Sequence, residues 1–219
     1  MSERVVVTGL MTQKLSIVGI LFGSLLGGLA VGCEPGGVGD PCVPEDEYQP
    51  TFSGFSVEEV NVESKSFQCV TRICLVNHFR GRVSCPYGNS QSSANMGQAV
   101  PPPDCIIPGD PAAKIEAAVD PQLTERRADD AVYCSCRCDG PDANARYCEC
   151  PSGFSCVRLV EELGIGDRGQ LAGSYCVREG TAYNKFEVDV NNSCQYADRD
   201  VPDGEQNCGQ VNDFGEPAD

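Results

Sequence analysis

Fifteen cysteines in a chain of 219 residues constrain the fold more than any other feature of the sequence. Such a number is typical of exported proteins, in which disulfides take the place of a large hydrophobic core. An odd number leaves one thiol without a partner inside the chain, so that thiol must be reactive, bonded to another molecule or modified. Identifying the cysteine without a partner would therefore indicate how the chain is processed.

An apolar segment near the N-terminus has the form of an export signal. Residues 15–32, LSIVGILFGSLLGGLAVG, carry no charge, and Lys14 precedes them. A helix that spans a bilayer needs about 20 apolar residues, and this glycine-rich run is slightly shorter than that. We expect residues 1–32 to be a signal peptide that is removed, with Met11 as an alternative start.

The end of this segment, Leu29-Ala30-Val31-Gly32-Cys33, resembles the lipobox of bacterial lipoproteins, although its leucine stands one place further from the cysteine than in the commonest form. The resemblance implies cleavage after Gly32, a diacylglycerol thioether on the Cys33 sulfur, and a fatty acyl chain such as palmitate on the new amino terminus. Two or more acyl chains make membrane attachment durable. The alternatives are an uncleaved membrane helix and an ordinary secretory signal with Cys33 in a disulfide.

A lipid on Cys33 leaves an even set of fourteen cysteines, enough for up to seven disulfides. We therefore predict a disulfide-rich, mainly β fold with one or two short helices, built from small irregular sheets or hairpins. The number of conceivable pairings is too large for the spacing to select one. The cysteines are Cys42, Cys69, Cys74, Cys85, Cys105, Cys134, Cys136, Cys138, Cys148, Cys150, Cys156, Cys176, Cys194 and Cys208.

Metal binding is the other role that many cysteines can have. The sequence contains no C-x-x-C and a single histidine, His78, whereas zinc sites usually combine such pairs. The cysteines of residues 134–138 and 148–150 could bind a soft cation such as copper(I) as thiolates. Because an oxidising compartment favours disulfides, we predict no metal and no cofactor, and keep thiolate metal binding as an alternative.

Composition divides the mature chain into three parts. Residues 33–50, rich in glycine, proline and acid, are predicted to be the lipidated cysteine and a flexible tether. Residues 51–208 form the disulfide-rich domain, with a subdivision near residues 100–125, where a proline-rich stretch occurs. Residues 209–219 are a loose acidic tail. Each side of the subdivision holds an odd number of the fourteen cysteines, so at least one disulfide must cross it if all are paired.

Local patterns predict short elements within the domain. The β-branched and aromatic run 66–76 favours a strand, with Gly81 closing a hairpin onto residues 82–85. Asp110 and Pro111 before alanines favour a helix over 110–118, and the same signal at Asp120 favours a second helical turn through Arg127. Strands are expected at 154–160 and 174–178.

The segment Cys148-Glu149-Cys150-Pro151-Ser152-Gly153-Phe154-Ser155-Cys156 resembles the closing part of epidermal-growth-factor-like modules, although the last gap is shorter here. The resemblance covers nine residues and implies a tight, disulfide-bound turn before the final cysteine.

The net charge of the chain and the motifs that it lacks exclude several classes of function. A formal net charge of −16 repels nucleic acid and anionic membrane, so neither is expected as a ligand. The sequence lacks G-x-S-x-G, H-E-x-x-H and phosphate-binding loop motifs, and His78 beside two arginines is predicted to be a solvated loop residue. Residues 198–204 miss the spacing of a calcium loop by one residue and are predicted to be an acidic turn.

These patterns predict a lipid-anchored protein of the bacterial cell envelope, held by Cys33 to the outer membrane in preference to the inner, and lying in the periplasm or at the surface. We expect a binding or structural role, with a protein or an envelope polymer as partner and no catalytic residues. The alternatives are a secreted or anchored hydrolase with an unrecognised site and the thiolate metal-binding protein.

Overall fold

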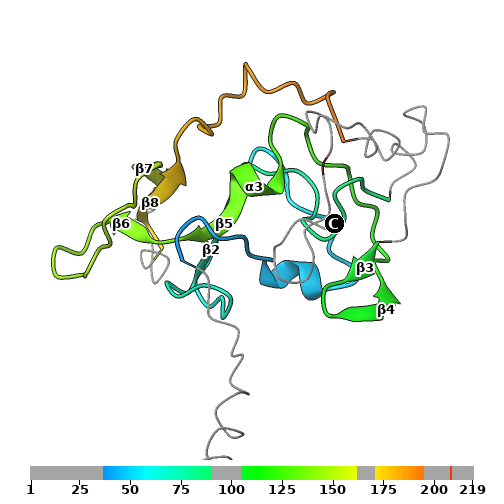
Figure 1. The fold of residues 1–219 in the computed structure, drawn as a ribbon, viewed down its shortest axis with the longest axis horizontal. Helices are drawn as coiled ribbons and strands as arrows, with labels where there is room; N and C mark the ends of the chain where they lie inside the picture. The colour runs from blue at the N-terminus through cyan, green and yellow to red at the C-terminus, as the bar shows by residue number, and fades with distance from the viewer. Residues whose placement is uncertain (1–36, 90–104, 162–170, 195–207, 209–219) are drawn as a thin grey trace, which may run out of the picture. The chain divides into compact units, whose positions relative to one another are not determined.

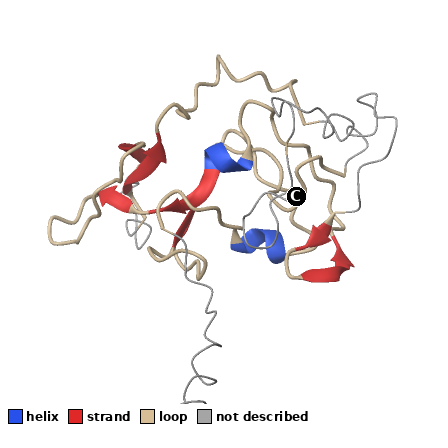
Figure 2. Cartoon of the chain, viewed as in Figure 1, coloured by secondary structure: helices blue, strands red, loops and turns tan. Residues whose placement is uncertain are grey.

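Short antiparallel strands joined by long loops make up the part of the chain that the structure describes (Figures 1 and 2). The structure is a computed structural model, and it describes residues 37–89, 105–161, 171–194 and 208. The elements in chain order are η1 (Glu45–Tyr48), β1 (Val60–Glu63), β2 (Ile73–Asn77), β3 (Ile106–Ile107), β4 (Asp110–Lys114), α3 (Ala128–Ala131), β5 (Val132–Ser135), β6 (Arg137–Asp139), β7 (Phe154–Val160) and β8 (Gly173–Arg178).

The strands form three small sheets, in the orders β1-β2-β5, β3-β4 and β6-β8-β7. All the pairings between neighbouring strands in these sheets are antiparallel. A disulfide-rich, mainly β fold was predicted, and the described residues confirm it. Among them, no helix has the length and apolar character needed to cross a bilayer. The predicted signal peptide and the tail 209–219 lie outside the described residues.

The sheet β1-β2-β5 carries a hydrophobic cluster on each of its two faces. Successive side chains of a strand point to opposite faces. On β2, Val76 therefore joins the cluster that contains Phe55 and Phe79, whereas Leu75 joins the cluster of Tyr133 and Tyr175. Because Tyr175 belongs to β8, this second cluster packs the sheet β6-β8-β7 against β1-β2-β5.

All fourteen cysteines that follow Cys33 form disulfides, including Cys42 in the predicted tether. The first five cysteines after Cys33 supply two local bridges and one long one. Of the seven, only Cys69–Cys134 crosses the predicted subdivision, as the odd numbers on its two sides require. Cys33 lies outside the described residues. The pairs are Cys42–Cys74, Cys69–Cys134, Cys85–Cys105, Cys136–Cys148, Cys138–Cys156, Cys150–Cys176 and Cys194–Cys208.

The helix predicted over 110–118 is wrong, because these residues begin with strand β4. Ile107 pairs with Asp110 across a two-residue turn made of Pro108 and Gly109. Gly109 has a φ of 74°, and a proline followed by a glycine at positive φ is the sequence that such a reversal favours. The Asp110 carboxylate still accepts a backbone hydrogen bond, from the N–H of Ala112 at 3.0 Å, but within the turn rather than at a helix start.

The second helical turn, predicted from Asp120 to Arg127, is also displaced. Residues 123 and 126 close a non-helical turn, and the helix α3 begins only at Ala128. The Arg126 side chain is buried and donates to the backbone carbonyls of Asn77, His78 and Thr181. These contacts with distant segments outweigh the local preference for a helix.

The hairpin predicted at Gly81 is absent, because β2 pairs with β1 and β5 on its two sides. Gly81 instead exchanges two backbone hydrogen bonds with Phe55, at 2.9 and 3.0 Å. Its φ is 90°, and a side chain at this position would collide with the Asp120 carbonyl. Residues 82–85 form a separate tight turn, with Arg82 opposite Cys85. The predicted strand 66–76 is shorter too, since β2 begins at Ile73.

Folded structure begins within the segment that the composition assigned to a flexible tether. Gly39 donates to the Cys134 carbonyl at 2.8 Å, and the N–H of Cys134 donates to the Asp40 carbonyl at 2.7 Å. These bonds hold residues 39–41 alongside β5, and the Cys42–Cys74 disulfide fixes them there. Residues 37–40 form a turn and residues 39–41 pair along β5, so this part of the predicted tether is not a free linker. The strand β7 has the predicted bounds, and β8 extends the predicted strand by one residue.

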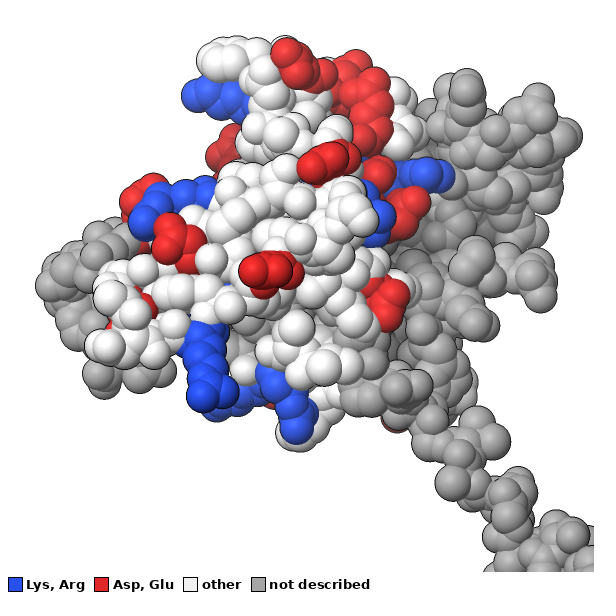
Figure 3. Space-filling view, turned by 60° about the vertical axis from the view of Figure 1, so that its left-hand side comes forward, with Lys and Arg blue, Asp and Glu red and all other residues white. Residues whose placement is uncertain are grey.

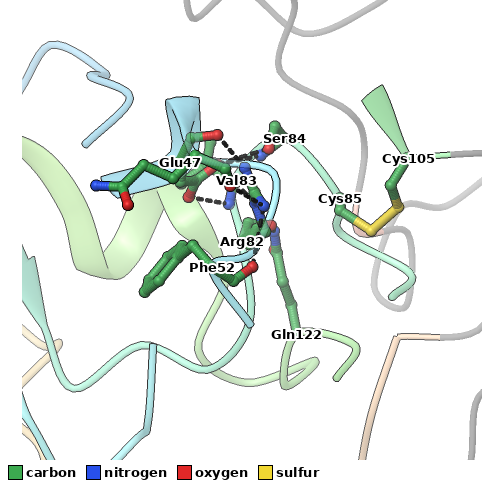
Figure 4. Close-up of polar contacts among 9 residues, drawn as sticks. Glu47, Phe52, Arg82, Val83, Ser84, Cys85, Cys105 and Gln122 are labelled. Atoms are coloured by element: carbon green, nitrogen blue, oxygen red, sulfur yellow. Dashed lines mark hydrogen bonds and ion pairs between the residues drawn. A yellow bond between two sulfur atoms is a disulfide. The ribbon is translucent and has the colours of Figure 1, made fainter. Parts of the chain in front are cut away.

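A buried ion pair fastens η1 to the turn at 82–85 (Figure 4). The side chains of Glu47 and Arg82 are both 0 % exposed, and their charged groups lie 4.0 Å apart. The Glu47 carboxylate accepts hydrogen bonds from the backbone N–H of Val83 at 2.7 Å and from the N–H and hydroxyl of Ser84 at 2.9 and 2.7 Å. Burial raises the pKa of Glu47, and these donors and Arg82 act against that rise.

The guanidinium of Arg82 is held by carbonyl oxygens on the other side. It donates to the Phe52 carbonyl at 3.0 Å and to the backbone carbonyl of Glu47, and it lies over the Phe52 ring. The Arg82 carbonyl in turn accepts from the Gln122 side chain at 3.1 Å. The pair thus connects three segments of the chain that are distant in sequence.

Removing one member of this pair should destabilise the protein strongly. Glu47→Ala leaves the Arg82 charge buried without a counterion, so we expect the free energy of unfolding to fall by about 3–5 kcal/mol. Glu45→Ala, on the same turn of η1 but at an exposed residue, should change it by less than about 0.5 kcal/mol. Urea unfolding with the disulfides intact measures both, and equal losses would contradict the role of the pair.

Candidate functional site

An open groove of about 640 Å³ lies between the η1 segment and the loop 64–72, which joins β1 to β2. Its walls include Val43, Glu45 and Tyr48 on one side and Lys65, Phe67 and Arg72 on the other. Its volume is within the range of pockets that bind small ligands or a few side chains of a partner. None of these residues was singled out from the sequence.

Covalent and hydrogen bonds hold the loop against its surroundings. The Gln68 amide makes two hydrogen bonds to the backbone of Val43, donating to the carbonyl at 2.8 Å and accepting from the N–H at 2.9 Å. Cys69, the next residue, is bonded to Cys134 on β5, and the Thr71 hydroxyl donates to the Ser135 carbonyl. A loop fixed in this way loses little conformational entropy when it binds a partner.

The backbone of the loop turns sharply at Arg72. Its φ is 64°, a left-handed conformation that is uncommon for residues other than glycine, and a hydrogen bond from the Ser66 N–H to the Arg72 carbonyl closes the loop at 3.1 Å. This turn places the Arg72 guanidinium over the Phe67 ring, 4.6 Å from its centre. Strained residues of this kind often occur at binding sites, where neighbouring contacts hold them in place.

Three large hydrophobic side chains are exposed at and beside the groove. Phe67 is 81 % exposed, Val70 is 63 % exposed and Tyr48 is 47 % exposed. Single exposed hydrophobic residues are common, but three near one groove on a tethered loop are typical of an interaction surface. Loops carried by a rigid framework are also where binding residues concentrate.

Charges of both signs line the same groove. Glu45 and Glu63 lie near one another, since the Glu63 carboxylate accepts from the Glu45 N–H at 3.0 Å, and Lys65 and Arg72 come from the loop. Burial raises the pKa of Glu63, and the carboxylates of Glu45 and Asp46 add to that rise. Figure 3 shows one face of the molecule, on which acidic and basic side chains lie among a larger uncharged area.

His78, the one histidine of the sequence, was predicted to lie in a solvated loop. It does lie just after β2, but its ring is half-buried, stacks on Tyr183 with ring centres 4.1 Å apart, and is 3.0 Å from the Val57 carbonyl through Nδ1. Burial lowers the pKa of His78, and the charge of Arg126 adds to this effect. The described contacts of the ring are those of a packed side chain rather than a solvated one.

A smaller hollow of about 210 Å³ lies beside α3 and includes carboxylates of Glu125, Asp130 and Glu187. Arg126 also lines the hollow, and its guanidinium donates to backbone carbonyls, as described above. Burial raises the pKa of Asp130, and the neighbouring Asp129 contributes. A group of acidic residues is common on the surface of so acidic a chain, and it indicates no ligand by itself.

Three groups of cysteine sulfurs lie close enough together to suggest metal ligation: Cys42, Cys69 and Cys134; Cys136, Cys148 and Cys176; Cys138, Cys150 and Cys156. Every one of these sulfurs belongs to a disulfide in this structure. A metal would require thiolates, so the clustering here results from neighbouring disulfides. Residues 198–204, compared above with a calcium loop, lie outside the described residues.

Comparison of the chain with protein families, with curated proteins and with solved structures finds no match. The chemistry of the described residues is therefore the basis for the function proposed below.

Replacing Glu63 with glutamine should make the protein relatively more stable as the pH rises. A carboxyl group whose pKa is raised by folding stabilises the folded state below its unfolded pKa, and this contribution is lost as the pH rises through the folded pKa. Glu63→Gln keeps an acceptor for the Glu45 N–H but does not ionise. Its unfolding free energy minus that of the wild type should therefore increase from about pH 4 to about pH 7, by less than about 1 kcal/mol because the group is half-exposed.

Urea unfolding at both pH values measures this difference. Glu58→Gln, at an exposed residue just before β1, controls for the loss of one negative charge. A difference that decreased with rising pH would contradict the assigned direction of the shift.

Proposed function

We propose that this protein is a lipid-anchored component of the bacterial cell envelope that binds another protein through the groove beside the loop 64–72. The observation that supports binding is the exposure of Phe67 and Val70 on a loop that a disulfide and the Gln68 hydrogen bonds hold in place. A loop that served only to connect two strands would gain nothing from exposing these side chains to water.

The composition of the surface favours a protein over a polymer as partner. Aromatic and arginine side chains are enriched among the residues that contribute most to protein–protein binding, and Phe67 with Arg72 forms such a pair. The groove also offers Glu63 and Lys65, so a partner with polar groups of both signs around an apolar side chain would fit it.

The groove lies close to the proposed anchor along the chain. From Cys33 to Val43 the chain can span at most about 35 Å, even if it is fully extended. A lipid on Cys33 would therefore keep the groove within that distance of the bilayer surface. A partner in or on the same membrane would be reached without a long linker, and tethering would raise its effective concentration.

Replacing Cys33 should release the protein from the membrane. We expect wild-type protein extracted with detergent to begin at Cys33, to carry acyl mass, and to gain fourteen alkyl groups only after reduction, since fourteen cysteines are in disulfides. Cys33→Ser should move it to the soluble fraction. The double variant Cys85→Ser, Cys105→Ser is the control, because it removes cysteines but leaves the anchor. Intact mass and cell fractionation measure both, and a wild-type chain that retained Met1 or Met11 would contradict the proposal.

A crosslinking experiment tests the groove. A photoreactive residue in place of Val70 should give a discrete protein adduct in intact bacterial cells that make the protein, whereas the same residue in place of Val190, which is 48 % exposed, should not. Phe67→Ala in the Val70 variant should reduce the adduct at least about fivefold, because truncating a central aromatic side chain typically costs 1 kcal/mol or more of binding. Equal adducts from both positions, or a polydisperse polymer adduct, would contradict a protein partner at this site.

A further inference from the structure

Three disulfides lie side by side around the sheet β6-β8-β7, whose strands are labelled in Figure 1, and their six sulfurs form a continuous cluster. The Cys176 sulfur of Cys150–Cys176 is 3.5 Å from the Cys136 sulfur and 3.7 Å from the Cys148 sulfur. The Cys150 sulfur, at the other end of the same disulfide, lies within 4.8 Å of those of Cys138 and Cys156. Cys150–Cys176 is thus the middle bridge between Cys136–Cys148 and Cys138–Cys156. These residues are called the six-sulfur cluster below.

Strand register explains the cluster. Cys156 on β7 lies directly opposite Cys176 on β8, so their side chains project from the same face of the sheet. The two cysteines do not bond to each other. Each bonds instead to a cysteine from another segment, Cys138 and Cys150 respectively, which brings the two disulfides side by side.

The cluster is most exposed to solvent at Cys156, while Cys138, Cys148 and Cys150 are partly exposed and Cys136 and Cys176 are buried. Cys156 is exposed, and it is the only exposed residue among the fourteen disulfide cysteines. Cys176 is 0 % exposed and Cys136 is 6 % exposed. A reagent can therefore reach the Cys156 sulfur most easily, and the Cys150 sulfur of the middle bridge lies within 4.8 Å of it.

A second cluster of disulfides is built in the same way, but its cysteines are not accessible to solvent. Cys74 on β2 lies opposite Cys134 on β5, and each is bonded elsewhere, to Cys42 and Cys69. All four cysteines of this four-sulfur cluster are at most 2 % exposed. Comparison of the two clusters separates the effect of contact between disulfides from the effect of access to solvent.

We propose that the six-sulfur cluster is a thiol–disulfide exchange site that accepts electrons from an external dithiol at Cys156 and passes them to the inner bridges. Exchange requires a thiolate that reaches a disulfide sulfur, and the sulfurs that would react within the cluster lie within 4.8 Å of each other at the Cys138–Cys150 step and 3.5 Å apart at the Cys176–Cys136 step. Its substrates are dithiols, for example a dithiol protein of the same compartment.

The steps balance as follows. A thiolate of the dithiol attacks the Cys156 sulfur, forming a mixed disulfide and releasing the Cys138 thiolate. That thiolate attacks the Cys150 sulfur, forming a Cys138–Cys150 disulfide and releasing the Cys176 thiolate. The Cys176 thiolate then attacks the Cys136 sulfur, forming a Cys136–Cys176 disulfide and releasing the Cys148 thiolate. The second thiol of the dithiol, as its thiolate, then attacks its own mixed disulfide and releases Cys156. The dithiol is oxidised to a disulfide, and the protein gains two thiols.

Limited reduction of the lipidated full-length protein tests this sequence. The native protein is treated with one equivalent of dithiothreitol, quenched with a maleimide, digested without further reduction and mapped by mass spectrometry. We expect a peptide pair joined by a new Cys138–Cys150 disulfide, together with maleimide on Cys148 and Cys156. The cysteines of the four-sulfur cluster should remain unlabelled. Label confined to Cys138 and Cys156, with no Cys138–Cys150 bond, would overturn the proposal, and so would equal labelling of the four-sulfur cluster.

Removing the Cys138–Cys156 disulfide, at which the external dithiol is proposed to attack, gives a second, kinetic test. In the double variant Cys138→Ser, Cys156→Ser, the rate at which one equivalent of dithiothreitol exposes thiols on the remaining four cysteines of the cluster should fall at least about tenfold, because access limits exchange. The control Cys85→Ser, Cys105→Ser removes a bridge outside the cluster and should leave that rate unchanged. Equal rates in the two variants would overturn the proposal. If the Cys138→Ser, Cys156→Ser variant does not fold, the mapping of the wild-type protein decides the question.

Discussion

The long disulfide between Cys69 and Cys134 is the constraint on which the described structure depends most. It joins residues 65 positions apart and, in a chain-entropy account, stabilises the fold by about 4 kcal/mol through restricting the unfolded chain. It also links the two halves of the sequence, which the pairing of β2 with β5 joins through backbone hydrogen bonds as well. Its neighbour Cys42–Cys74 brings the start of the folded part to the same sheet, so the edge at residues 39–41, β2, the loop 64–72 and β5 all meet at these four sulfurs.

The candidate groove follows from that arrangement. A loop bonded through Cys69 to β5 and through Gln68 to Val43 cannot collapse onto the core, so Phe67 and Val70 stay in solvent. The other wall is η1, which the buried pair of Glu47 and Arg82 holds in place. The loss of solvation on burying an ion pair is only partly offset by the hydrogen bonds of the pair. The contribution of Glu47 and Arg82 is therefore to set the position of η1. Both walls are therefore rigid before any partner binds.

Much of the architecture could be predicted from composition and local pattern, but specific segments could not. The β7 run contains Phe154, Val157 and Val160, follows a glycine, and pairs with a neighbour nearby in sequence, so its prediction is confirmed. Residues 110–118 were misassigned because the start signal at Asp110 and Pro111 is shared by helices and by turns that end in a strand. The groove was missed because Phe67 and Val70 belong to a run that reads as a buried strand, and no local feature distinguishes an exposed aromatic residue from a buried one.

The sequence by itself determined the number of paired cysteines, the need for a bridge between the two halves, the disulfide-rich β class, and the prediction of a lipid at Cys33, because these depend on counts and on short local motifs. Only the tertiary structure decided which sulfurs meet. Cys74 lies opposite Cys134, and Cys156 opposite Cys176, yet all four bond to cysteines from other segments. Pairing of this kind is set by strand register and by the packing of the sheets, which depend on the whole chain in three dimensions and not on the spacing of cysteines along it.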